Sequence, residues 1–76
     1  MFKITKLTGH QVQALREGIQ TGAIRADLGA TTAVFHQEQR DAYQDVKDFQ
    51  TAQGREHGTR GGHYQSLHAV LRKLSA

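Results

Sequence analysis

The segment from residue 54 to residue 62, GREHGTRGG, contains the residue types best suited to binding chemistry. It has four glycines, two arginines and one histidine, and no apolar side chain. Glycines let backbone N–H groups approach an anion closely, a following helix start adds partial positive charge, and Arg55 and Arg60 can form bidentate contacts. The segment lacks the spacing and the lysine of a P-loop. It is either an anion-binding loop or, in the commoner case, a solvated connector between two helices.

Five histidines in 76 residues raise the question of a metal site. His57, His63 and His68 are close in sequence. However, five residues of helix separate two side chains by about 140°, so His63 and His68 do not share a face as ligands four residues apart would. The chain has no cysteine, so thiolate ligands and thiol nucleophiles are excluded. We therefore expect neither a metal ion nor another cofactor.

Acid–base catalysis would have to use Glu56, His57 and His63, the cluster in which a base could be held by a second group. A ribonuclease with His57 and His63 as base and acid, and Arg55 or Arg60 on the phosphate, is our third hypothesis for the function. Catalytic groups must be held to within about half an ångström, and a glycine-rich segment opposes such positioning. We therefore predict that the chain is not an enzyme.

Charged residues are unevenly distributed along the chain. Four acids recur at steps of three, four and three and would line one side of a helix: Glu38, Asp41, Asp45 and Asp48. Such a row either meets a basic partner or, more commonly, is the solvated back of an amphipathic helix. Four bases follow in the last third of the chain, near a tyrosine that could stack on a base: Arg55, Arg60, Arg72 and Lys73, with Tyr64.

The composition limits the size and the surroundings of the protein. The length of 76 residues predicts one small domain, residues 1–76, with a modest core, and the net charge is +3. No apolar run approaches the roughly 18 to 20 residues that span a bilayer, and residue 1 onward lacks a signal-peptide pattern. We expect a cytoplasmic protein without membrane contact.

The secondary structure predicted around the candidate site residues is mainly helical, with one extended segment near residue 1. Alternation of Phe2 and Ile4 with polar residues predicts an extended or β arm over 2–6. No partner strand is predicted, so the arm either packs alone or pairs with a second copy in a homodimer. Thr8 and Gln11 have the spacing of a capping box, which predicts a helix from about 9 to 21.

The rest of the chain predicts two further helices. A short helical turn is expected between Gly22 and Gly29. A long helix is predicted over 32–53 from the apolar residues Val34, Phe35, Ala42, Val46 and Phe49, and a third over 63–74 from Tyr64, Leu67, Leu71 and Leu74. Residues 54–62 would be the loop between them. The predicted fold class is mainly α: a small three-helix domain with a long central helix and a short N-terminal extended or β arm.

These features predict a small regulatory or inhibitory protein that acts through protein–protein contacts. The expected contact residues are Arg55, His57, Arg60, His63, Tyr64, Arg72 and Lys73. Nucleic-acid binding through the same loop and the last helix is the main alternative. A helix-turn-helix is disfavoured because the first two long helices are joined by more than a short turn and the longer one is acidic. Small chains of this type are often encoded by phages and plasmids, which is an association only.

Overall fold

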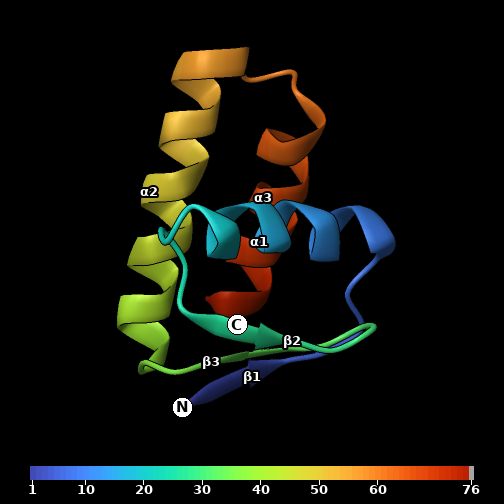
Figure 1. Cartoon of the computed structure of the whole chain (residues 1–76), viewed down its shortest axis with the longest axis vertical. Helices are drawn as coiled ribbons and strands as arrows, with labels where there is room; N and C mark the ends of the chain where they lie inside the picture. Colours follow the sequence, from blue (N-terminus) through green and yellow to red (C-terminus); the bar gives the residue numbers. More distant parts are fainter. Residues whose placement is uncertain (76) are drawn as a thin grey trace.

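The computed structural model describes residues 1–75, and it confirms a small, mainly α fold with a long central helix. The elements in chain order are β1 (Phe2–Ile4), α1 (Gly9–Gln20), β2 (Ala26–Leu28), β3 (Ala33–Phe35), α2 (Gln39–His57) and α3 (Gly62–Leu74). Figure 1 shows α2 and α3 side by side, α1 lying across α3, and the small sheet beneath the helices at one end of the molecule.

Helix α1 begins as the sequence predicts. The Thr8 hydroxyl accepts a hydrogen bond from the Gln11 backbone N–H at 3.3 Å, and the Gln11 side-chain oxygen accepts one from the Thr8 backbone N–H at 3.0 Å. This capping box satisfies two N–H groups that a helix start leaves without intrahelical partners. The helix ends at Gln20, and Gly22 follows in a left-handed conformation with φ of 84°.

The structure corrects the predicted turn over 22–29 and the predicted helix start at 32. Ala26–Leu28 and Ala33–Phe35 are antiparallel strands, and the three strands lie in the order β1-β3-β2. Along β3 the burial alternates, since Ala33 and Phe35 face the core and Val34 is half-buried on the other face. Alternating burial is typical of a β-strand. Because β3 has only three residues, this alternation was too short to be recognised in the sequence, where the spacing of the apolar residues favoured a helix.

The N-terminal arm is a strand with a partner in its own chain. Phe2 lies opposite Phe35, and Ile4 lies opposite Ala33. The strand is shorter than predicted and ends at Ile4. A homodimer therefore no longer follows from an unpaired strand.

The junction between the two long helices differs from the predicted loop. Helix α2 continues through residues 54–57 and ends at His57. Gly58 caps it, with φ of 84° and a hydrogen bond from its backbone N–H to the Gly54 carbonyl oxygen at 2.9 Å. Positive φ is a conformation that favours glycine, so Gly58 and not Gly54 stops the helix. The connection is a short turn, residues 58–61, and α3 begins at Gly62, one residue earlier than predicted.

The core lies between the inner face of the sheet and the three helices. Its largest fully buried apolar side chains are Leu15, Ile24, Phe35, Val46, Leu67, Val70 and Leu74. Burial of these side chains is the main favourable contribution to folding. Within residues 1–75 there is no helix with both the length and the apolar character needed to cross a bilayer.

Candidate binding groove

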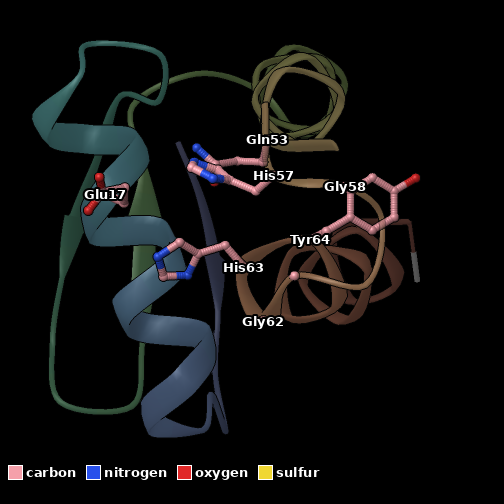
Figure 2. Close-up of a pocket in the computed structure, with 8 residues that line it drawn as sticks. Glu17, Gln53, His57, Gly58, Gly62, His63 and Tyr64 are labelled. Carbon is pink, nitrogen blue, oxygen red and sulfur yellow. The ribbon is translucent and has the colours of Figure 1, made fainter. Parts of the chain in front are cut away.

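Two adjoining pockets lie where the start of α3 faces α1. The first has a volume of about 280 Å³, and its walls include Glu17, Gln53, His57 and His63. The second has a volume of about 470 Å³ and continues along α1. Both are lined by Gly62 and His63, so we call the two together the α1–α3 groove. Figure 2 shows the side chains of the first pocket.

Helix α1 forms one wall of the groove with three polar side chains. His10, Gln13 and Glu17 are spaced by three and four residues, which places them on one face of the helix. All three are exposed. The opposite face of α1 is buried, with Leu15 fully inside the core. This wall is therefore held in place by the packing of the fold.

Helix α2 contributes Gln53 and His57, which lie four residues apart and point the same way in Figure 2. Gln53 is only 9% exposed, yet no hydrogen bond joins its side chain to another of residues 1–75. Gln50, one turn earlier, differs because its side-chain amide donates to the Tyr64 carbonyl oxygen at 3.4 Å. The Gln53 amide therefore has its accessible surface toward the pocket.

The start of α3 supplies backbone N–H groups to the same pocket. Its N-cap is Gly61, which has no side chain to accept a hydrogen bond, and its first turn contains no acidic residue. No group in the described chain accepts a hydrogen bond from the backbone N–H of Gly62, His63 or Tyr64. Unpaired N–H groups at a helix start create a partial positive charge.

The residues predicted for partner contact fall into two groups in the structure. His57, His63 and Tyr64 line the first pocket, and Arg60 is exposed in the turn beside it. Arg55 is exposed on the last turn of α2. The remaining two, Arg72 and Lys73, are at the other end of α3, about 15 Å from its start at 1.5 Å per residue.

Lys73 belongs to a different part of the surface. It lines a pocket of about 240 Å³ together with Phe2, Lys3, Ile4 and Thr5 of the first strand and the residue after it. Arg72 and Lys73 also lie in the last helical turn, where cations favourably offset the partial negative charge of the helix end. The structure thus does not bring these two residues to the α1–α3 groove.

Tyr64 is a packing residue, although the sequence suggested a ring available for stacking. It is half-buried, and a Cβ built on Gly54 would lie 2.9 Å from its Cε2 atom. In Figure 2 the ring points away from His57 and His63. The ring therefore holds α3 against α2 at the position where Gly54 leaves room for it.

The acidic row on α2 has contacts within the fold. Glu38 precedes the helix and Asp41 lies in its first turn, where acids interact favourably with the helix dipole. An Asp45 side-chain oxygen lies 3.9 Å from Arg25 Nε, and Asp48 accepts a hydrogen bond from a glutamine of the same helix at 2.9 Å. These contacts favour the structural interpretation of the row over a partner-binding one.

The imidazoles of the groove are weakly held. His57 Nε2 lies 3.8 Å from Glu56 Oε2, and both side chains are more than half exposed. No hydrogen bond within residues 1–75 orients the His63 ring. The same residues contain no group of three or more His, Asp or Glu side chains placed to hold a metal ion. The groove therefore offers groups for polar recognition, and nothing described fixes an acid–base pair.

Sequence reasoning missed His10, Gln13, Glu17 and Gln53 as lining residues. Gln53 and His57 share a helix face because α2 continues past Gly54. The sequence predicted a loop from residue 54, so His57 was not expected to lie on the same helix as Gln53. The α1 residues face the start of α3 through a packing arrangement between distant segments, for which the sequence carries no local signal. No family model matches the chain, and neither do the curated proteins or solved structures with which it was compared.

Proposed function

We propose that the protein is a non-enzymatic regulatory or inhibitory binding protein that acts through protein–protein contacts. The proposed contact surface is the α1–α3 groove together with the turn 58–61. The observation that carries the proposal is the position of unpaired polar groups, the Gln53 amide and the first N–H groups of α3, in one concave surface. Such groups gain hydrogen bonds when a partner fills the groove.

The surroundings of the groove suit an interface. Its walls come from three helices whose opposite faces form the core, so the surface is preorganised and little ordering is needed on binding. Its margin is polar and includes the exposed Arg60. Arginine is enriched in protein interfaces, where its guanidinium forms several hydrogen bonds at once.

Partner capture from the native host tests this proposal. The Arg60→Glu variant changes the charge in the turn beside the groove, and Arg72→Glu makes the same change of charge at the other end of α3. We expect the first variant to lose the captured protein and the second to keep it. Capture that survives the first variant, or is lost only with the second, contradicts the proposed surface.

Nucleic-acid binding is the second candidate, and one observation favours it. Lys3 and Lys73 line the same pocket, so the sheet end of the molecule gathers cations that are separate in sequence. Binding to phosphates must weaken steeply as salt rises, because bound cations release counterions from the nucleic acid. Titrations with DNA and RNA at two salt concentrations separate the candidates. Salt-dependent binding abolished by Arg72→Glu, Lys73→Glu would replace the protein-binding proposal.

A further inference from the structure

We propose that the pocket between α1 and the start of α3 binds a carboxylate, supplied by an acidic side chain of the partner protein. This inference rests on the proposed function and specifies its chemistry. The pocket is the first of the two pockets of the groove, with a volume of about 280 Å³. That volume accommodates a carboxylate together with the methylene groups of an aspartate or glutamate.

The first turn of α3 supplies donors for one side of the carboxylate. Gly62 and His63 line the pocket, and their backbone N–H groups have no acceptor within the described chain. The start of α1 has the Thr8–Gln11 capping box. The start of α2 has no side-chain cap hydrogen bond either, but Asp41 places a negative charge in its first turn, and α3 has no such acid. An anion at the start of α3 would fill the role that a capping side chain fills in α1.

Gln53 is a second and independent indication of a ligand. Its side chain is more than nine-tenths buried, makes no hydrogen bond to the other described residues, and lines the same pocket. No fully buried side-chain N or O atom among the described residues lacks a partner, so the polar atoms of Gln53 keep their access through the pocket, and its NH₂ group can donate to a ligand there. A carboxylate bound by the N–H groups of α3 has a second oxygen that can accept from Gln53.

The charges around the pocket favour a carboxylate over a phosphate. Glu17 stands on the α1 wall, Glu56 Oε2 lies 3.8 Å from His57 Nε2, and Arg60 lies in the adjoining turn, so the pocket has no excess of fixed positive charge. The attraction for an anion therefore comes from the partial positive charge at the start of α3 and from hydrogen bonds with its N–H groups and the Gln53 amide. A group with one negative charge suits this balance better than a dianion, which Glu17 would repel more strongly.

Nuclear magnetic resonance of the full chain tests the proposal without knowledge of the partner. The signals to follow are the backbone amides of Gly62 and His63 and the side-chain NH₂ of Gln53. The probes are acetate, a blocked tripeptide with a central glutamate, its glutamine counterpart, and inorganic phosphate, all at constant ionic strength. We expect saturable shifts of these three signals with acetate and with the glutamate peptide, and none with the glutamine peptide.

Variants at the pocket test the sign of the charge and the role of the amide. Glu17 is exposed, and Glu17→Gln removes the repulsion between its carboxylate and bound acetate. This variant should therefore lower the Kd for acetate about threefold. Gln53→Leu should raise that Kd about tenfold, because it removes a hydrogen bond to a charged group. Asp48→Asn, an exposed residue of α2 outside the pocket, is the matched control and should leave the Kd unchanged.

Three results would overturn the carboxylate site. These are the absence of saturable shifts at the three signals, tighter binding of phosphate than of acetate, and weaker acetate binding by the Glu17→Gln variant. If acetate fails to bind while partner capture still depends on Arg60, the carboxylate site is wrong and the proposed function stands. If acetate binds as expected and no variant affects capture, the pocket binds a carboxylate, but its supply by a partner protein and the protein-binding surface are both wrong.

Discussion

Gly54 of α2 lies directly against the ring of Tyr64 of α3. A Cβ built on Gly54 would come within 2.9 Å of Cε2 and 3.1 Å of Cδ2 of that ring. Because Gly54 has no side chain, the Tyr64 ring and the start of α3 can lie close to α2 at this position. This contact sets the position of the turn 58–61 and of one wall of the α1–α3 groove.

A double-mutant cycle tests the contact between Gly54 and Tyr64. Alanine is favoured over glycine inside a helix by about 1 kcal/mol. In the Tyr64→Ala background we expect Gly54→Ala to raise the free energy of unfolding by about that amount. In the native background the ring opposes the new methyl group, so the gain should shrink or reverse. Urea unfolding of the four proteins measures the difference, and equal effects in both backgrounds would refute the contact.

Gly18 of α1 is expected to tolerate no side chain. A Cβ there would lie 2.4 Å from Ile24 Cδ1 and 3.1 Å from Phe49 Cδ2, inside the core. Gly18→Ala should therefore lower the free energy of unfolding by about 1–3 kcal/mol despite the better helix propensity of alanine. Gly9→Ala is the matched control, because nothing lies within 4 Å of its Cβ position. Thermal unfolding that ranks Gly9→Ala below Gly18→Ala would contradict this packing.

The capping box should contribute measurably to stability. Thr8→Ala removes the hydroxyl that accepts from the Gln11 N–H and should cost about 1 kcal/mol of the free energy of unfolding. Thr51→Ala makes the same chemical change at an exposed position within α2, where the hydroxyl donates to the Lys47 carbonyl oxygen at 3.0 Å; the better helix propensity of alanine offsets that bond, so no loss is expected. Chemical denaturation of the two variants provides the measurement. A loss for Thr51→Ala equal to that for Thr8→Ala would show that the cap contributes nothing specific.

The two faces of β3 should respond differently to substitution. Phe35 is 1% exposed, so Phe35→Ala should cost about 3–5 kcal/mol, enough to unfold much of a domain of this size. Val34→Thr changes a half-buried residue on the opposite face and should cost less than about 1 kcal/mol. Circular dichroism and urea unfolding distinguish the two. Similar losses for both would contradict the alternation of this strand.

Local signals were sufficient to predict much of the helical structure. The Thr8–Gln11 capping box marked the start of α1, and the spacing of Leu67, Leu71 and Leu74 marked α3. The strands were harder to predict because each has three residues, and β1 and β3 pair across about thirty residues of chain. Tertiary pairing therefore decided between helix and strand at Val34 and Phe35, where local spacing favoured a helix.

The candidate site was predictable in part. The glycine-rich segment led to His57 and His63, which do lie in one pocket. It did not lead to Gln53 or Glu17, because Gly54 looked like a helix stop and α1 reaches the pocket only through the tertiary fold. The similar charges of Arg60 and Lys73 suggested one surface, but the length of α3 separates them.

Site-specific photo-cross-linking is the most direct test of the α1–α3 groove as the surface that binds a partner protein. A photoreactive amino acid replaces Gln13 in the groove, Asp48 on α2, or Lys3 on the sheet, all of which are exposed. The three proteins are then irradiated in extracts of the native host. We predict one cross-linked protein from position 13 and none from positions 48 and 3. Cross-linking from position 48 or 3 with none from position 13 would contradict the groove as the binding surface.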